Sequence, residues 1–284
     1  MPVAMGAYVR GYPRDPAALE RYADLVGRWP AIVHVFRNWT DDTRDFDASL
    51  ADQVTNSGAA LMISWQPPAG DLRPIADGLA DDYVRSYARA VAAWGGPLLI
   101  RFGHEMNGQW IPWRSSPEAF TGAWHRLHAA FAAGGAANVR WVWSPHVPDA
   151  RADRFEAYYP GHDVVGWVAL DGYNWGRSQP DTRWQSFEEI FADAYRDLGT
   201  LAPGKPIMLA EIGCTDEGGD KAAWLRETFM DAIPARFPAV RAVAWFHANP
   251  RGHADWRVDS SPAALEAWRE VVRSPHYSEA MDFS

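Results

Sequence analysis

Two glutamates stand where buried strands are expected to end, and a pair of carboxyl groups can perform acid–base and nucleophilic chemistry. Glu105 lies in the stretch RFGHEMNGQWIPW (101–113), directly after the apolar run PLLI. Glu211 follows a second apolar run, PIMLA. Short apolar runs bounded by polar residues are typical of buried strands. The ordinary alternative is a structural ion pair, for which Arg101 is a candidate partner of Glu105.

The composition favours one large globular domain that does not bind nucleic acid. The chain has 284 residues, 48% of them hydrophobic, with 16 Trp, 12 Phe and 10 Tyr. This length suits a single α/β barrel, and the aromatic content can supply both a core and a binding surface. The net charge of −9 argues against nucleic acid, which requires a basic face. The sequence lacks the basic cluster or amphipathic basic helix that would indicate binding to a membrane surface. We expect a monomer.

Targeting signals leave the compartment open. The single cysteine, Cys214, excludes an intramolecular disulfide and is expected to be a small packing residue. No apolar run reaches the length of a membrane-spanning helix, and the opening MPVAMGAYVRG lacks the features of a signal peptide. The protein is therefore expected to be either cytoplasmic or secreted after removal of a leader.

Short apolar runs alternate with amphipathic segments along the whole chain, which is the pattern of repeated βα units. Eight strands are predicted, at 4–9, 31–36, 59–64, 97–102, 139–143, 164–170, 206–210 and 240–246. Helices are predicted at 15–29, 46–58, 81–94, 117–135, 183–198, 221–237 and 261–272, with only a short one, 150–159, in the fifth interval.

This alternation predicts a (β/α)₈ TIM barrel that forms a single domain over 1–284, with 274–284 as a C-terminal surface tail. An open doubly wound sheet is the alternative. It is disfavoured because GAYVRGYP after the first strand is not the glycine-rich phosphate loop of that fold.

The ends of the predicted strands carry the residues that could perform chemistry. Barrel enzymes place their active sites at this face. The residues there are Arg37, Asn38, Trp39, Trp65, Gln66, His104, Glu105, Asn107, Ser144, His146, Asp171, Tyr173, Asn174, Trp175, Glu211, Trp245 and His247. Because the fourth and seventh strands lie across a barrel from each other, Glu105 and Glu211 are expected to face each other over its mouth.

Two facing carboxyl groups are what glycosidic bond cleavage requires, since one protonates the leaving oxygen and the other attacks the sugar. Indole rings stack on the apolar faces of pyranose rings, so the tryptophans at strand ends support the same chemistry. We expect at least three of them to line a substrate cleft. The candidates are Trp39, Trp65, Trp110, Trp113, Trp175 and Trp245.

Metal and serine chemistry are weaker interpretations. HEMNG begins like the zinc motif HExxH, but the second histidine is absent. His125 and His128 lie on a predicted helix with no carboxylate partner, and no GxSxG nucleophile elbow occurs. No metal and no cofactor are expected.

At these residues the sequence resembles the family 26 glycoside hydrolases, best known as β-mannanases and members of the clan A retaining barrel enzymes. Most families of that clan carry Asn-Glu at the end of strand four, whereas family 26 has His-Glu, as at His104-Glu105. The resemblance extends to WVWSPH (141–146), YYPG (158–161), DGYNW (171–175), LAEIG (209–213) and AWF in the eighth strand.

The resemblance implies a role for each matching residue. Glu105 would be the acid/base and Glu211 the nucleophile. Tyr173 would donate a hydrogen bond to the nucleophile, and His104 would hold the sugar before the cleavage point. The other implied substrate-binding residues are Trp110 and Trp245, which would stack on sugar rings, and Arg101 beneath the site. Their positions near strand ends add Asn107, Trp113, Trp175 and Trp65 as candidates.

The implied activity is that of an endo-acting retaining β-glycanase whose partner is a β-linked polysaccharide or oligosaccharide, with β-1,4-mannan expected first. Alternatives within the family are a mixed-linkage β-1,3-1,4-glucanase and a β-1,3-xylanase. The alternative of another class is a non-catalytic polysaccharide-binding protein, which would not need both Glu105 and Glu211.

Overall fold

The computed structural model describes residues 2–250 and 254–283. Its strands pair in the order β2-β3-β4-β5-β6-β7-β8-β1, and a further pairing of β2 with β1 closes the sheet into a barrel with surrounding helices. Neighbouring strands run parallel, as in the register Tyr8↔His34 between β1 and β2. The predicted (β/α)₈ fold is therefore confirmed.

The barrel strands are short, largely buried apolar segments, as a parallel sheet covered by helices requires. In β4 (Leu98–Phe102) every residue is buried, including the charged Arg101. The remaining barrel strands are β1 (Val3–Val9), β2 (Ile32–Asn38), β3 (Ala60–Gln66), β5 (Val139–Trp143), β6 (Trp167–Asn174), β7 (Ile207–Cys214) and β8 (Val240–His247).

The helices follow their sequence signals for starting and stopping. Asp47, Ser116, Ser186, Asp220 and Ser261 each accept a hydrogen bond from the first turn of the helix that follows. The helices are α1 (Ala17–Val26), α2 (Ala48–Asn56), α3 (Arg73–Ala76), α4 (Asp81–Trp94), α5 (Pro117–Ala133), α6 (Phe187–Leu201), α7 (Lys221–Arg226), α8 (Ile233–Arg236) and α9 (Pro262–Arg273).

Three local features differ from the prediction. The helix predicted at 221–237 is divided into α7 and α8 by a π-helical segment, Glu227–Ala232. The helix predicted at 150–159 is only a 3₁₀ turn, Glu156–Tyr158, and α3 was not predicted. A single four-residue helix has too little periodicity to stand out in a sequence.

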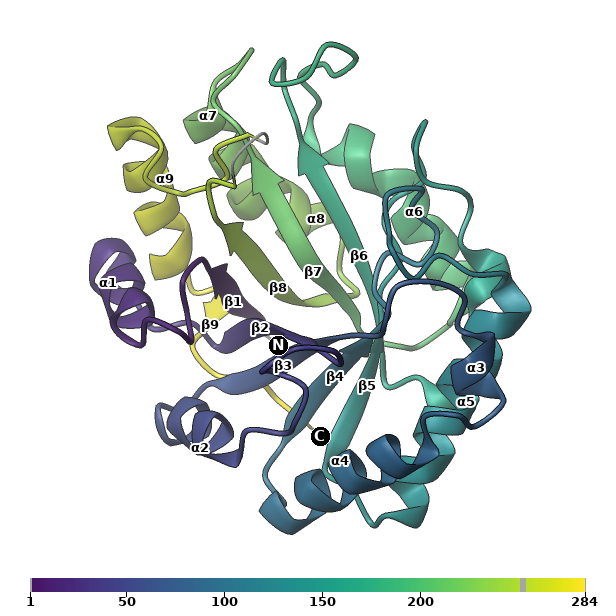
Figure 1. Cartoon of the computed structure of the whole chain (residues 1–284). Helices are drawn as coiled ribbons and strands as arrows, with labels where there is room; N and C mark the ends of the chain where they lie inside the picture. The colour runs from purple at the N-terminus through teal and green to yellow at the C-terminus, as the bar shows by residue number, and fades with distance from the viewer. Residues whose placement is uncertain (1, 251–253, 284) are drawn as a thin grey trace. The chain divides into compact units, whose positions relative to one another are not determined.

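The chain divides into two compact units, Met1–His34 with Leu170–Asp282, and Val35–Ala169 with Phe283. In the first unit β7 and β8 run side by side in the sheet (Figure 1). The outer face of β8 packs through Trp245 on Trp268 of α9, with 4.9 Å between ring centroids. In the second unit β3 packs through Trp65 on Tyr87 of α4, at 4.6 Å.

The closing segment is not wholly a surface tail. Tyr277–Ser278 forms a short strand, β9, that pairs with β1 through Val3↔Tyr277. The Tyr277 side chain is buried, and its hydroxyl donates to the carbonyl of Phe229 at 2.6 Å. The tail predicted for 274–284 is therefore wrong at these two residues, because burial of one aromatic ring anchors the segment. Within the described ranges, every helix is too short or too polar to cross a bilayer.

Candidate active site

Glu105 lies in the turn after β4, in a backbone conformation that is unusual for its type. Its φ of 54° is in the left-handed region, and it is the one non-glycine residue with positive φ among those described. Its amide donates to the Ser144 carbonyl at 2.8 Å, and its carbonyl accepts from the Gly108 amide at 2.7 Å. Such strain costs energy and clusters at functional sites, where surrounding contacts enforce it. The side chain is 8% exposed, so the carboxylate is held at a defined place in the loop.

Trp110 contacts the carboxylate directly. Its indole Nε1 donates to Glu105 Oε2 at 2.7 Å, and its ring meets His146 edge to face at 4.9 Å. The Trp110 side chain is 43% exposed. An indole that is both exposed and hydrogen-bonded to this carboxylate can offer a ring face to a ligand beside Glu105.

His104 and Trp113 form a packed pair under the same turn. The His104 ring lies between Phe36, at 5.5 Å, and Trp113, at 5.0 Å between centroids. Trp113 Nε1 donates to the His104 carbonyl at 3.1 Å. Trp113 is only 4% exposed, and this hydrogen bond helps to fix the backbone of His104. The role of Trp113 as a substrate-binding residue stays a prediction.

Asn107 and Arg101 are fully buried and support the turn from within the protein. The Asn107 amide donates to the carbonyls of His146, at 2.9 Å, and Asp153, at 2.7 Å, and its oxygen accepts from the His146 amide. Arg101 donates to Ser64 Oγ at 2.8 Å. These side chains hold the turn after β4 against its neighbours. The prediction that they contact substrate is corrected, because neither has exposed surface.

Trp65 and Trp39 also belong to the core. Trp65 has no exposed surface, its Nε1 donates to Tyr83 Oη at 3.2 Å, and its ring packs on Tyr87. Trp39 is 5% exposed and packs on Trp65 at 4.6 Å. Successive side chains of a strand point to opposite faces. On β3 the inward residue is Ser64, and Trp65 faces the helices, so the prediction that Trp65 lines a cleft is wrong.

In the other unit, Glu211 of β7 accepts a hydrogen bond from a tyrosine. Tyr173 of β6 donates from Oη to Glu211 Oε2 at 2.5 Å. Glu211 is 5% exposed. The pKa of Tyr8 on β1 is raised by burial and by the negative charge of Glu211, which places this hydroxyl within the electrostatic reach of the carboxylate. The hydrogen bond from Tyr173 helps to fix the orientation of the Glu211 carboxylate.

The aromatic residue that faces Glu211's neighbours from β8 is Phe246, one position beyond the predicted Trp245. Phe246 is partly exposed, stacks on Tyr8 at 4.6 Å and meets Tyr173 edge to face at 5.8 Å. Trp245 has no exposed surface and faces the helices, so its predicted role in sugar stacking is wrong. Tyr8 and Phe246 are paired in register across β1 and β8, a relation that the sequence does not display.

Trp256 completes this aromatic group and was not predicted. Its ring lies 4.8 Å from Tyr173, and also 4.8 Å from Trp175, which it meets edge to face. Trp175 keeps partial exposure, whereas Trp256 is 2% exposed. Trp256 follows the end of β8 by nine residues, so no strand-end rule could have found it.

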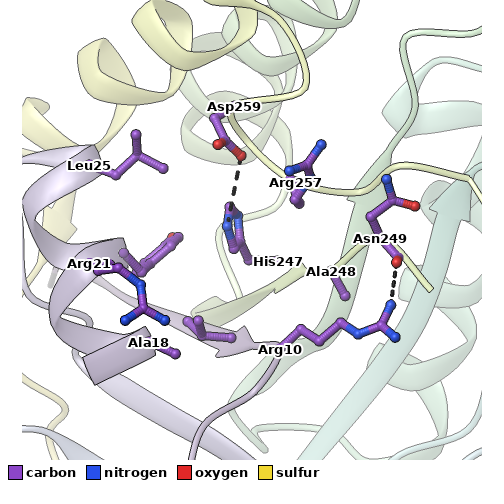
Figure 2. Close-up of a pocket in the computed structure, with 11 residues that line it drawn as sticks. Arg10, Ala18, Arg21, Leu25, His247, Ala248, Asn249, Arg257 and Asp259 are labelled. Carbon is purple, nitrogen blue, oxygen red and sulfur yellow. Dashed lines mark hydrogen bonds and ion pairs between the residues drawn. The ribbon is translucent and has the colours of Figure 1, made fainter. Parts of the chain in front are cut away.

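A cavity of about 640 Å³ opens beyond the ends of β1 and β8 (Figure 2). Figure 2 shows Arg10 reaching the carbonyl of Asn249, and His247 facing Asp259 at 3.9 Å. Burial lowers the pKa of His247 to about 4, so its imidazole is neutral at pH 7. Its Nδ1 accepts from the Val258 amide at 3.2 Å. The cavity thus combines planar polar groups with apolar side chains, and it is lined by residues of α1, the end of β8 and the segment before α9.

Among the described residues no cluster of three or more His, Cys, Asp or Glu side chains has the arrangement of a metal site. Cys214 is fully buried and burial raises the pKa of its thiol, so it packs in the core and is not poised as a nucleophile.

The comparisons with known proteins identify the family. A family model described as Glycosyl hydrolase family 26 matches residues 70–232. The chain belongs to this family.

The chain is similar to part of each of two longer curated proteins. Endoglucanase H of Acetivibrio thermocellus is 36% identical over 277 residues, which cover 94% of this chain and 30% of the relative. Mannan endo-1,4-beta-mannosidase A and B of Caldalkalibacillus mannanilyticus is 30% identical over 162 residues, covering 53% of this chain and 28% of the relative. The chain thus spans less than a third of the length of either.

Solved structures support the fold. The β-mannanase BoMan26A of Bacteroides ovatus aligns with a TM-score of 0.71 at 17% identity, covering 100% of this chain and 92% of that one. A modular endo-β-1,4-mannanase of Cellulomonas fimi aligns with a TM-score of 0.70 at 16% identity, covering 100% of this chain and 74% of that one.

Proposed function

We propose that this chain is the catalytic region of an endo-acting retaining β-glycanase, with Glu211 as the nucleophile and Glu105 as the acid/base. The observation that carries the proposal is that each of these buried glutamates accepts a hydrogen bond from an aromatic side chain, Tyr173 at 2.5 Å and Trp110 at 2.7 Å. Membership of glycosyl hydrolase family 26 supports the same assignment.

The proposed reaction is a double displacement. The Glu211 carboxylate attacks the anomeric carbon, and the Glu105 carboxyl group gives its proton to the departing glycosidic oxygen. A glycosyl ester on Glu211 results. The Glu105 carboxylate then takes a proton from water, the water oxygen attacks the anomeric carbon, and Glu211 leaves as a carboxylate. The mechanism requires the two carboxyl groups to be about 5–5.5 Å apart.

The first candidate substrate is a β-1,4-linked mannan. Relatives named as mannan endo-1,4-beta-mannosidases support it, at 30% and 27% identity. Mannose and glucose differ in the orientation of the C2 hydroxyl, so discrimination must come from a group beside it. His104 is suited to this because its ring is fixed between Phe36 and Trp113, and a fixed side chain distinguishes two hydroxyl orientations better than a mobile one.

The second candidate substrate is a β-glucan. The relative named Endoglucanase H is more similar than the mannosidases, at 36% identity, and it covers 94% of the chain. A relative named Beta-1,3-xylanase TXYA, from a Vibrio species, is 24% identical and adds a third polymer to the test.

Initial rates on glucomannan, mannan, barley mixed-linkage glucan and β-1,3-xylan at equal mass concentration decide among these substrates. We expect release of reducing ends that is faster on the two mannans, with β-anomeric products seen first by NMR. A clear preference for barley glucan or xylan transfers the assignment to that polymer. Binding of a polymer without any release of reducing sugar would identify a non-catalytic binding protein instead.

Two variants test the residue roles. Glu211→Ala should lose several orders of magnitude in rate on every substrate. Glu105→Ala should lose most activity on polysaccharide but far less in the first step with an activated aryl leaving group, and azide should restore its turnover and yield a β-glycosyl azide. Glu217→Ala, which removes an exposed glutamate that follows β7, is the matched control and should keep wild-type rates. Equal losses on polymer and aryl substrates in Glu105→Ala would reject it as the acid.

A further inference from the structure

Lys221 is a buried ammonium group at the first position of α7. It is 1% exposed and directly follows the N-cap residue Asp220. A cation at the N-terminus of a helix is repelled by the helix dipole, and burial of a charge is costly. The stability of α7 therefore does not explain why a lysine occupies this position. The chain has 27 Lys and Arg residues, of which only Lys205 and Lys221 are lysines.

The Lys221 ammonium has all three of its donors directed at one segment, the loop that precedes α9. Nζ donates to the carbonyl of Arg257 at 2.6 Å, to Ser260 Oγ at 2.8 Å and to the carbonyl of Asp255 at 3.3 Å. A lysine offers three donors around one compact nitrogen, whereas arginine offers a planar fork. Three acceptors that converge on a point therefore select lysine in a chain whose cations are otherwise arginines.

The two carbonyls held by Lys221 are those on either side of Trp256. The Trp256 backbone is fixed further, since its carbonyl accepts from Trp245 Nε1 at 2.8 Å and its amide donates to the Ala248 carbonyl at 2.9 Å. The Trp256 ring lies 4.8 Å from the ring of Tyr173. The Tyr173 hydroxyl in turn donates to Glu211. A continuous series of contacts thus leads from the ammonium to the carboxylate.

We propose that Lys221 is a positioning residue for Glu211, acting by clamping the backbone of Trp256 so that its ring holds Tyr173 in hydrogen-bonding position. This inference rests on the proposed role of Glu211 as nucleophile. Lys221 does not touch the reacting atoms. Its effect is expected in the rate at which Glu211 attacks, with substrate affinity unchanged.

The clamp depends on the charge of the ammonium. Burial, the largest cause, lowers the pKa of Lys221 to about 8, and nearby negative groups oppose this shift. A neutral amine has two donors for three acceptors, so the clamp weakens as pH rises through this value. The titratable and charged groups that face Lys221 are Cys214 of β7, Asp216 between β7 and α7, His247 at the end of β8, and Asp255 and Asp259 in the clamped loop, which also carries Arg257.

The test is the rate at which Glu211 is labelled by 2,4-dinitrophenyl 2-deoxy-2-fluoro-β-mannobioside or -cellobioside, reagents that need no acid catalysis. Lys221→Met should label about 10- to 100-fold more slowly at saturating reagent, the scale of a small displacement of a reacting group. The reagent concentration that gives half-maximal labelling rate should be the same in Lys221→Met as in the wild type. Lys205→Met, in the other lysine, is the control and should match the wild type. The label is located by peptide mass spectrometry.

The pH profile separates positioning from a general loss of stability. In Glu105→Ala, which lacks the acid/base, the labelling rate should fall with a midpoint near about 8. In Glu105→Ala/Lys221→Met that step should be absent. Labelling of Lys221→Met at the wild-type rate, or a step that persists in the double variant, overturns the inference. If the Lys221 variants do not fold, a flat profile in Glu105→Ala overturns it equally. A label on a residue other than Glu211 overturns the proposed function itself.

Discussion

Replacement of Tyr173 by phenylalanine removes one atom from the group around Glu211 and leaves the ring contacts intact. The lost hydroxyl donates to Glu211 Oε2 at 2.5 Å. The ring keeps its neighbours Trp256, at 4.8 Å, and Phe246, at 5.8 Å between centroids. The variant therefore reports on the hydrogen bond and not on packing.

The size of the rate loss in Tyr173→Phe, and the reaction step that is slowed, depend on when Glu211 gains or loses its charge. In the proposed double displacement, Glu211 carries no charge in the glycosyl ester and departs as a carboxylate in the second step. A hydrogen bond to a charged group is worth about 1.5–3 kcal/mol. At about 1.4 kcal/mol for each factor of ten, loss of the donor should slow departure of Glu211 by roughly 10- to 150-fold. The first step consumes the charge, so it should slow less.

Pre-steady-state kinetics with an activated aryl glycoside check this prediction. We expect a burst of aryl alcohol in Tyr173→Phe, with kcat and KM falling together because the glycosyl-enzyme accumulates. Tyr159→Phe is the control, since the Tyr159 hydroxyl has no hydrogen-bond partner in the described part of the chain and its ring packs on Trp143. A fall in kcat/KM with no burst and an unchanged KM would refute the reasoning, because the hydrogen bond would then serve the first step.

Two further predictions concern histidines. His104→Ala should lower kcat/KM by about 10²-fold, the scale of one strong transition-state hydrogen bond. A thermal melt checks that the loss of its packing against Phe36 and Trp113 has not unfolded the protein. A decrease of less than about threefold would exclude the predicted contact between His104 and the sugar. The pKa of His247 is lowered from 6.5 to about 4. Between these two pH values the unfolded chain binds a proton that the folded chain does not, so the free energy of unfolding decreases as the pH is lowered. Between pH 7 and pH 4 this group should lower the free energy of unfolding of the wild type by about 3 kcal/mol. In denaturant titrations His247→Gln should lack this contribution. An identical pH dependence of the two proteins would contradict the prediction.

The fold could be predicted because its signals are local and repeated. Each barrel strand is a short apolar run, and each major helix has an amphipathic pattern with a capping residue, so an error of one or two residues at an end changes nothing in the topology. What could not be predicted depends on distant contacts. The anchoring of Tyr277 requires the carbonyl of Phe229, 48 residues away, and no local pattern encodes that contact.

The two glutamates could be selected from the sequence because carboxylates directly after apolar runs, surrounded by indoles and amides, are uncommon in a core. The aromatic residues around them could not be chosen by type. Of the six tryptophans considered for a cleft, Trp110 and Trp175 keep appreciable exposure, while the other four are packed. The expectation that at least three would line a cleft is therefore not met by those six.

The errors at Trp65 and Trp245 have one physical cause. Alternation along a strand has a period of two, so an assignment displaced by one residue exchanges the two faces completely. Trp245 pairs in register with Ile212, not with Glu211, so it shares the helix-facing side of the sheet. The next residue, Phe246, therefore lies on the side of Glu211. Its partner across β1 is Tyr8, whose pKa is raised by burial and by the negative charge of Glu211. Once Glu211 is placed, register alone determines which aromatic rings lie on its side of the sheet, and that register becomes available only when strands far apart in sequence are paired.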